Sequence, residues 1–486
     1  MIGVADRTQT AAITDIPWDE SDPQPEQPRL VSLFAAAPGL SAADFLRAAH
    51  GAERFYWAEP GHGLTLAGAG VAAQLVAPPT LPDDAERLPA QRFADIEAQA
   101  RALFDRAIVR PAASAPDTAA ADLARPRLFG GFAFQDDFVP DNTWSVFNSA
   151  EFVLPHYQLA QRDGATYLTI NALVGPDEEL EDALRGLAEA LAARLASTPS
   201  QPPTPSGGAS LRYPMTRAMW NEVIDRATAT IADGRLQKVV LARVCEVRAG
   251  ALIDATAPLA YLDAHYGDSY RFLFEPCPHH AFIGATPELL VSKRSRDVAT
   301  MALAGSAARG ATPAEDDALA AHLLGSVKDR HEHQLVVDAI RAHLADAADD
   351  LDLPAQPAVL KLRNIQHLLT PITGRLRRPV DGILPLVRRL HPTPAMGGVP
   401  PERALAFLRD AEPVPRGWYA APIGWLDSEL DGVFAVGIRS AVTQHDRAWL
   451  YAGAGIVAGS SPEREWAETA LKFRPMLGAL GVAGGN

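Results

Sequence analysis

The residues best placed to do chemistry lie on one helix that is predicted near the C-terminus. Ser461 can cap the N-terminus of this helix, and Pro462 suits its first turn. At about 100° per residue, three charged side chains fall within an arc of roughly 60°: Glu465, Glu468 and Lys472. Paired carboxylates favour a hard cation such as Mg²⁺, whereas the alternative is an ordinary solvated helix face.

The segments before this helix offer a place for an anion. Residues 435–441 are predicted to form a strand that carries one arginine, Arg439, and the glycines Gly453 and Gly455 are predicted to lie in a Gly-rich loop. A helix N-terminus that follows such a loop favours an anionic ligand, because backbone N–H groups are exposed there. Together with the carboxylates, this pattern predicts a site for a small acidic ligand held partly through a metal.

A second acidic pair supports the metal site. Residues 326–344 are predicted to form a helix, and Asp329 and Glu332 extend its apolar stripe, which includes Val336 and Ile340. These carboxylates therefore point towards the core, where unpaired charges are costly and need a cation or donors. Two helices, each with an acidic pair, can hold one Mg²⁺ between them, and one glutamate from each helix is sufficient.

The same helix also raises the possibility of zinc, because it contains His331, Glu332 and His333. The zincin motif HExxH places both histidines on one helix face, whereas these two are only two residues apart and diverge. The two cysteines of the chain form no cluster. Magnesium is therefore favoured over zinc.

Two further residues are candidates for acid–base catalysis. Lys238 begins a strand predicted over residues 237–247, and desolvation near another cation would make it a general base; otherwise it extends to water. Glu288 follows a strand and a Thr-Pro turn, and burial there would make it a general acid; otherwise it is an ordinary cap.

Other polar positions have weaker signals. The N–H groups of Gly305 and Ser306 could meet a carboxylate, although a plain tight turn is an equal alternative. His367 and His391 are isolated histidines, which are more often structural than catalytic. No GxGxxG unit, phosphate-binding GxxxxGK[ST] loop or GxSxG elbow occurs, so nucleotide binding and serine hydrolysis are unsupported.

Composition narrows the class of protein. The chain has 486 residues and a net charge of −15 without a basic run, so we expect no nucleic-acid partner. No segment resembles a signal peptide or a membrane span, so we expect no membrane association. Cys245 and Cys277, the two cysteines, fit a reducing cytoplasm. An anionic ligand would need local positive charge, for which Arg439, Lys472 and Lys238 are candidates.

Apolar strands alternate with Ala-rich helices along most of the chain, which predicts a mixed α and β fold. Residues 1–27 are polar and Pro-rich and are predicted to form a loose tail. Residues 28–195 form a smaller N-terminal part, and residues 196–210, dense in Pro, Ser and Gly, form a linker or long loop. Residues 211–486 carry the charged motifs. The pattern is also compatible with both parts folding together as one unit.

These motifs together resemble the chorismate-utilising enzymes, which include isochorismate, salicylate, anthranilate and aminodeoxychorismate synthases. The resemblance is dense from Met215 to Leu480, through QKVVLAR, FIGATPELL, LAGSAARG, KDRHEHQLV, LHPTPAMGG, RGWYAAPIGW, AVGIRSA, YAGAGIV and EWAETALK. The N-terminal half is similar, through RFYWAEP, RLFGGFAF and ATYLTIN, to the longer isochorismate synthases of menaquinone pathways.

The resemblance implies an α+β fold like that of anthranilate synthase component I, with large antiparallel sheets packed together and flanking helices. It implies Mg²⁺ as cofactor, bound by Glu332 and Glu465, with Asp329 and Glu468 supporting the ion through water. The metal would hold the ring carboxylate of chorismate. The chorismate-binding residues implied are Gly305, Ser306, His367, His391, Ala395, Tyr419, Arg439, Gly453, Gly455 and Lys472.

Three positions point to one member of the family, an isochorismate synthase. Ammonia-using members typically carry Gln where this chain has Lys238, so the resemblance implies that water is the nucleophile and that no glutaminase subunit is required. Lys238 would activate this water for attack at C2, and Glu288 would protonate the departing C4 hydroxyl. Ala304 stands where aminodeoxychorismate synthases have a nucleophilic lysine. HPTPA resembles isochorismate synthases, since salicylate synthases have threonine where this chain has Ala395.

The implied activity is an Mg²⁺-dependent, reversible isomerase reaction that serves menaquinone biosynthesis. Three alternatives stay open: a salicylate synthase that also eliminates pyruvate, an isochorismate synthase of siderophore biosynthesis, and a non-catalytic homologue that binds small acids.

Overall fold

A computed structural model describes residues 28–80, 88, 90–112, 118–196, 208–377 and 382–482 of the chain. The predicted tail, residues 1–27, lies outside these ranges, as do residues 197–207 of the predicted linker. Among the helices in the described ranges, none is both long and apolar enough to cross a membrane.

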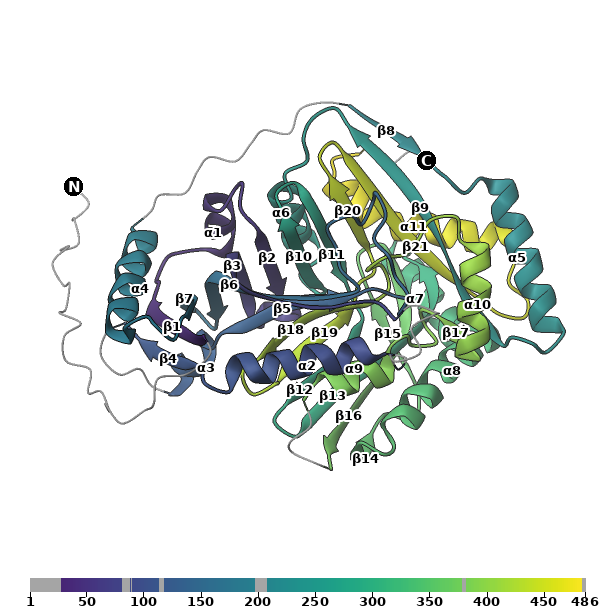
Figure 1. The fold of residues 1–486 in the computed structure, drawn as a ribbon. Helices are drawn as coiled ribbons and strands as arrows, with labels where there is room; N and C mark the ends of the chain where they lie inside the picture. Colours follow the sequence, from purple (N-terminus) through teal and green to yellow (C-terminus); the bar gives the residue numbers. More distant parts are fainter. Residues whose placement is uncertain are drawn as a thin grey trace.

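The structure is built on strands, with helices around them (Figure 1). The strands are β1 Arg29–Ala36, β2 Arg54–Ala58, β3 Thr65–Ala77, β4 Ile108–Pro111, β5 Arg127–Phe132, β6 Ala150–Arg162, β7 Ala165–Val174, β8 Ala209–Arg212, β9 Lys238–Ala249, β10 Tyr270–Cys277, β11 His280–Thr286, β12 Leu289–Arg294, β13 Asp297–Ala308, β14 Ala348–Asp352, β15 Ala358–Lys361, β16 Ile365–Leu376, β17 Gly398–Val399, β18 Pro422–Asp427, β19 Gly432–Val436, β20 Ser440–Gln444 and β21 Arg447–Ile456. The helices are α1 Ala42–Ala48, α2 Gln91–Phe104, α3 Thr118–Ala124, α4 Leu180–Leu195, α5 Arg217–Ala232, α6 Thr256–His265, α7 Pro313–Gly325, α8 Val327–Leu344, α9 Leu384–Leu390, α10 Pro401–Ala411 and α11 Pro462–Ala479.

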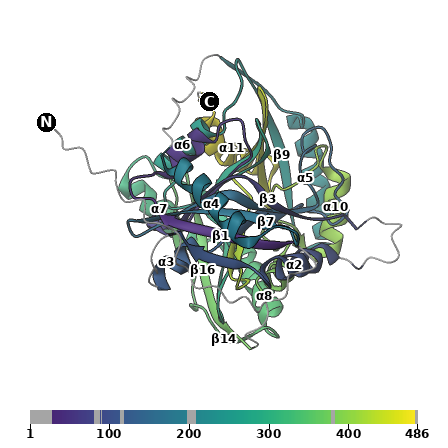
Figure 2. The same cartoon turned by 60° about the vertical axis from the view of Figure 1, so that its left-hand side comes forward.

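Within the described ranges, all 21 strands belong to one hydrogen-bonded network. Except for β1 and β4, which pair in parallel, the strand pairs of this network among the described residues are antiparallel. Helices lie against this network from outside; Figure 2 shows α4 beside β1 and β7. This arrangement confirms the predicted α+β fold with large antiparallel sheets and flanking helices.

The two halves of the chain share this network. β2 pairs with β3 on one side and with β10 on the other, and β5 pairs with β18. Arg54 of β2 donates two hydrogen bonds to Glu275 of β10, at 2.6 and 3.2 Å, and a third to Asp254 at 2.9 Å. Both side chains are buried, so the charge of each must be compensated by the other. This ion pair joins strands from residues 28–195 to strands from residues 211–486.

The apolar core also spans both halves. Trp418 packs against Phe147 and Phe274, with ring centres 5.4 and 5.0 Å apart. Trp144 lies so close to Gly417 that a Cβ there would be 2.2 Å from the indole ring. Gly417 also has a positive φ of 53°, so this close approach depends on glycine.

The two predicted acidic helices are present, and the cap predicted at Ser461 is confirmed. Ser326 caps α8 by accepting a hydrogen bond from the Asp329 N–H, and Ser461 caps α11 in the same way through Arg464. α8 packs against β13, and α11 packs against β21. The sheet therefore holds both acidic helices beside the strand pair β9–β21.

One predicted helix is shorter than expected. The helix predicted over residues 83–109 is α2, Gln91–Phe104. Ala90 precedes it with a left-handed φ of 59°, which ends helical geometry at that point. Residues 81–87 and 89 lie outside the described ranges.

The interleaved sheet makes a prediction for Gly130, which lies in β5 between β6 and β18. A Cβ there would be 2.0 Å from the Glu151 carbonyl oxygen and 2.7 Å from the Phe152 Cα, both backbone atoms. Gly130→Ala should therefore lower the free energy of unfolding by about 1–3 kcal/mol or more, measured by chemical denaturation. Gly186→Ala in α4, where nothing lies within 4 Å, is the control and should not destabilise. Equal stability of both variants would contradict this packing.

Candidate active site

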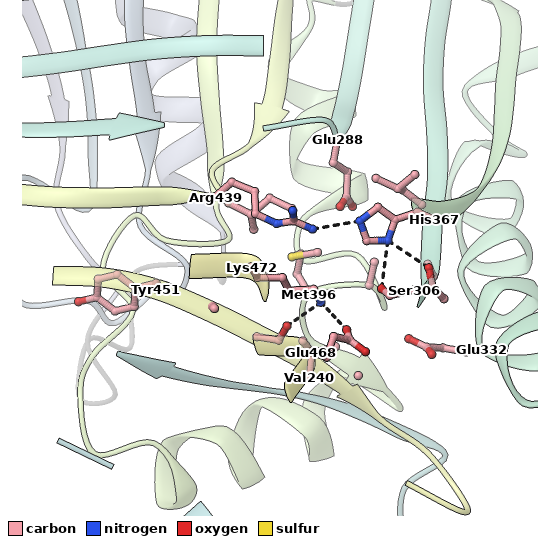
Figure 3. Close-up of a pocket in the computed structure, with 18 of the residues that line it drawn as sticks. Val240, Glu288, Ser306, Glu332, His367, Met396, Arg439, Tyr451, Glu468 and Lys472 are labelled. Carbon is pink, nitrogen blue, oxygen red and sulfur yellow. Dashed lines mark hydrogen bonds and ion pairs between the residues drawn. The ribbon is translucent and has the colours of Figure 1, made fainter. Parts of the chain in front are cut away.

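One cavity collects most of the residues predicted to act together (Figure 3). It lies among β9, β13, β16, β21, α8 and α11. The predicted residues that line it are Lys238, Glu288, Gly305, Ser306, Glu332, His367, Ala395, Tyr419, Arg439, Gly453, Gly455, Glu468 and Lys472. Three predicted residues do not line it: Asp329, Glu465 and His391.

Lys238 and Glu332 form an ion pair at one side of the cavity. Lys238 is the first residue of β9, its side chain is 1% exposed, and its Nζ lies 2.9 Å from the Glu332 Oε1. Lys238 is therefore buried and does not extend to water, and its charged partner is a carboxylate and not the second cation that the general-base alternative required. Glu332 reaches this position over Gly455, where a Cβ would lie 2.4 Å from its Oε1 and 3.2 Å from the Lys238 Cε.

Glu288 lies between β11 and β12 and caps no helix. Its N–H donates to the Thr286 hydroxyl at 3.2 Å, and its carbonyl oxygen accepts from the Val436 N–H at 3.0 Å. Glu288 as a whole residue is 3% exposed. Burial raises the pKa of Glu288 to about 7, although Lys238, Lys472 and Arg439 oppose the rise. A carboxylic acid that can donate a proton near neutral pH therefore faces the cavity.

His367 holds Arg439 in place from the opposite wall. The Arg439 Nη2 donates to the His367 Nε2 at 3.0 Å, and the His367 Nδ1 lies 3.1 Å from the Gly305 carbonyl oxygen and 3.0 Å from the Ser306 hydroxyl. This network assigns the proton to Nδ1, because Nε2 must accept from the guanidinium. Burial, together with Arg439 and Lys472, keeps the pKa of His367 well below its ordinary value. His367 is therefore a neutral support for a buried cation.

The prediction that Arg439 lies within a strand is wrong. It lies in the link between β19 and β20 and has a left-handed φ of 52°. Residues of β19 pair with β12 and β18, whereas β20 pairs with β11 and β21, so the chain changes partners at this link. The turn points the guanidinium into the cavity, as Figure 3 shows.

The predicted Gly-rich loop is also wrong, because Gly453 and Gly455 lie in β21. They pair with Ala242 and Val240 of β9, whose N–H groups bond to Glu412 and Gly397 instead. In an antiparallel ladder, these are the non-hydrogen-bonded pairs, so the peptide groups of both glycines point away from β9. Pairing of β21 with β20 ends at Leu450, and the two glycines line the cavity beyond that point. Both glycines therefore line the cavity from a strand and not from the loop that was expected.

Lys472 adds a second cation to the cavity. Its Nζ donates to the Gly453 carbonyl oxygen at 2.8 Å and to the Glu468 Oε1 at 2.6 Å. Burial tends to raise the pKa of Glu468, but the Lys472 ammonium outweighs this effect and lowers it. α11 thus presents an acidic and a basic side chain to the cavity, as the helical spacing predicted.

The four carboxylates predicted to bind a metal lie near one another but are not arranged as ligands. Burial raises the pKa of Asp329, with contributions from Glu332 and Glu468, and burial followed by Glu468 raises that of Glu465. Within the part of the chain that the structure describes, no three acidic, His or Cys side chains form a metal-binding group. The carboxylate chemistry and the mutual repulsion fit a hard divalent cation such as Mg²⁺.

The structure does not bring His391 to the cavity. It follows α9, its Nε2 lies 3.0 Å from the Phe134 carbonyl oxygen, and its ring packs against Phe134 at 5.6 Å. Burial, followed by the charge of Arg92, lowers the pKa of His391 to about 3. This histidine supports the apolar packing, and Ala395, four residues later, lines the cavity.

Sequence reasoning missed several apolar and aromatic walls of the cavity. Tyr451 stacks on the predicted Tyr419 with ring centres 5.0 Å apart, and Leu303, Met396 and Ile438 also line the cavity. The alternation in β9 indicated that Val240 shares a face with Lys238, and Val240 does line the cavity. Tyr451, Leu303 and Ile438 were part of apolar runs that had no feature to separate them from core residues.

The close approach at Gly455 predicts that Gly455→Ala loses most of the enzymatic activity expected of this cavity. The new Cβ would displace the end of the Glu332 side chain and disturb its pairing with Lys238. Because a displacement of about 1 Å can cost about 10²-fold in rate, we expect a loss of this size in kcat with little change in the thermal midpoint. The control, Gly267→Ala, has nothing within 4 Å and should retain full activity. Wild-type kcat in Gly455→Ala would contradict the arrangement.

Comparison with known proteins identifies the family of this chain. The family described as chorismate binding enzyme matches residues 15–481. The chain is 38% identical over 397 residues to the salicylate biosynthesis isochorismate synthase of Pseudomonas aeruginosa, covering 81% of this chain and 80% of the relative.

Solved structures agree as well. The menaquinone-specific isochorismate synthase of Escherichia coli superposes with a TM-score of 0.74 at 26% identity, covering 95% of this chain and 96% of that one. Anthranilate synthase component I of Streptococcus pneumoniae, at 18% identity and a TM-score of 0.67 over 86% and 93% of the two chains, shows the same fold. With the family match over most of its length, the protein belongs to the chorismate binding enzymes.

Proposed function

We propose that this protein is an isochorismate synthase, an isomerase that interconverts chorismate and isochorismate without ammonia or a glutaminase subunit. The observation that carries the proposal is that one cavity contains both an acid–base pair and two cations. Lys238 and Glu288 supply a base and an acid, and Arg439 and Lys472 supply positive charge for a dicarboxylate. The similarity to isochorismate synthases over most of the chain supports the same reaction.

The reaction forms one C–O bond and breaks another. Lys238, once deprotonated, takes a proton from a water molecule that attacks C2 of the ring. The double bonds shift, the C4–O bond breaks, and Glu288 gives its proton to the departing hydroxyl, which leaves as water. One water enters and one leaves, so substrate and product are isomers and the reaction is reversible.

The substrate's carboxylates would meet the positive side of the cavity. Arg439 is held by a neutral His367, and Lys472 is held by Glu468 and the Gly453 carbonyl oxygen, so both cations are already oriented. The peptide groups of Gly453 and Gly455 and the hydroxyl of Tyr419 add donors. Binding energy is therefore available without large rearrangement of these side chains.

Magnesium is part of the proposal. Glu332 and Glu465 would hold Mg²⁺, with Asp329 and Glu468 supporting it through water, because oxygen ligands and neighbouring buried carboxylates suit this ion. When bound, the metal supplies a positive charge that holds the ring carboxylate of chorismate. Removal of divalent metal with EDTA should therefore abolish turnover.

Product identification tests the function. We expect the purified protein with chorismate and MgCl₂, and without ammonia, to form isochorismate until it reaches a plateau with chorismate, as resolved by chromatography and NMR. Salicylate and pyruvate in equal amounts would identify a salicylate synthase instead. Anthranilate formed only when ammonia is added would contradict the role of Lys238 as an activator of water. Chorismate binding without any product would indicate a non-catalytic homologue.

We further propose that the isochorismate serves menaquinone biosynthesis in the cytoplasm. The similarity of both halves to the menaquinone-specific enzyme of Escherichia coli supports this role. The two cysteines are free thiols, which fits a reducing compartment. Quinone and siderophore analysis of a strain that lacks the gene would separate this role from siderophore biosynthesis.

The pKa of Glu288 predicts a pH dependence. Because it is raised to about 7, the protonated form that donates to the leaving hydroxyl is present below pH 7 and is lost as the pH rises through 7. The wild-type rate should fall on that alkaline side. Glu288→Gln should lose about 10²–10⁴-fold in kcat, and its residual rate should lack this fall. Glu402→Gln, an exposed control in α10, should keep the wild-type profile. An unchanged rate in Glu288→Gln would refute the assignment.

A further inference from the structure

Three of the carboxylates at the proposed metal site each meet a lysine. Glu332 lies 2.9 Å from Lys238, Glu468 lies 2.6 Å from Lys472, and Glu465 lies 3.1 Å from Lys328. Lys238 and Lys472 line the cavity, where the proposed reaction gives each a role. Lys328 does not line it, so its place on a buried carboxylate needs another explanation.

We propose that Lys328 is the internal counter-cation of the magnesium site: its ammonium neutralises Glu465 while the metal is absent and withdraws to solvent when the metal binds. The inference rests on the proposed Mg²⁺ site. It adds an exchange between two cations, one covalently attached and one free, at the same carboxylate.

The first support is the burial of Glu465, whose side chain is 3% exposed. A buried carboxylate needs a cation or strong donors, and Lys328 is the lysine that reaches it. The ammonium therefore occupies a carboxylate that is proposed to hold the metal.

The second support is that the two cations exclude each other. Mg²⁺ takes oxygen ligands at about 2.0–2.1 Å, and an ammonium has only donors and cannot be one of them. Lys328 is 3.1 Å from the Glu465 Oε1, so a metal bound to that carboxylate would lie close to the ammonium. Positive charges at such a short distance, in a partly buried site, repel each other strongly.

The third support is that Lys328 can leave easily. Its side chain is 28% exposed, compared with 1% for Lys238 and 15% for Lys472. It lies in the first turn of α8, next to the strongly exposed Val327, so its flexible stem reaches water without movement of the helix.

When Lys328 occupies Glu465, Mg²⁺ cannot bind there, so the apparent Mg²⁺ affinity falls with the fraction of molecules in which the lysine is bound. Removal of Lys328 should therefore tighten Mg²⁺ binding. In Lys328→Met, calorimetric titration with MgCl₂ and no substrate should give a dissociation constant about tenfold or more below the wild type. Without a counter-cation on Glu465, the thermal midpoint of this variant in EDTA should also fall. Lys328→Arg keeps the charge and should remain close to the wild type in both measurements.

The matched control is Lys361→Met, which removes a lysine paired with Asp316 and Asp317 away from the cavity. It should leave Mg²⁺ affinity unchanged. The movement itself is tested by acetylation of lysines with and without MgCl₂, read by peptide mass spectrometry. Lys328 should be labelled faster when MgCl₂ is present, and Lys361 should be labelled equally in both conditions.

The outcomes separate this inference from the proposed function. If the wild type binds Mg²⁺ but Lys328→Met binds it equally or more weakly, or if labelling of Lys328 does not rise, the exchange is refuted and the enzyme assignment stands. If the wild type binds no Mg²⁺ and forms isochorismate in EDTA, the metal site and the exchange are both refuted. If it binds Mg²⁺ with the expected exchange but forms no isochorismate, only the proposed reaction fails.

Discussion

The cavity depends on how closely α8 can approach the strand pair β9–β21. Gly455 permits that approach, because any side chain at this position would occupy the space that the Glu332 carboxylate fills. The approach brings Glu332 to Lys238 at the start of β9. The distance between α8 and the sheet is thus set by three residues, Gly455, Lys238 and Glu332. The other contacts of the cavity depend on this distance.

Charge balance then distinguishes the acidic groups. Glu332, Glu465 and Glu468 each have a lysine partner, so their charges are compensated although they are largely buried. Glu288 is also buried but has no ion pair among the contacts of the described residues, and burial raises its pKa to about 7. The Lys472 ammonium instead lowers the pKa of Glu468, so two glutamates of one cavity differ in which protonation state the fold favours.

The sequence predicted the features that depend on near neighbours. Ser461 caps its helix as predicted, and the helical spacing placed Glu468 and Lys472 together on the face of α11 that meets the cavity. It did not predict that Gly453 and Gly455 belong to a strand, because their partner β9 lies about 210 residues earlier. Arg439 and His391 were misplaced because contacts distant in the sequence decide their positions. Arg439 lies where the chain changes strand partners, and His391 packs against Phe134.

The sharing of one sheet by both halves has a consequence for synthesis on the ribosome. β2 and β5 are made early, but their partners β10 and β18 begin at Tyr270 and Pro422, more than 200 residues later. Until then the early strands present unpaired edges, which favour association with other chains. Arg54, a charged residue in β2, would protect such an edge before Glu275 arrives to neutralise it. Arg54 thus joins the two halves of the folded protein, and before β10 is made its charge would also reduce association of β2 with other chains.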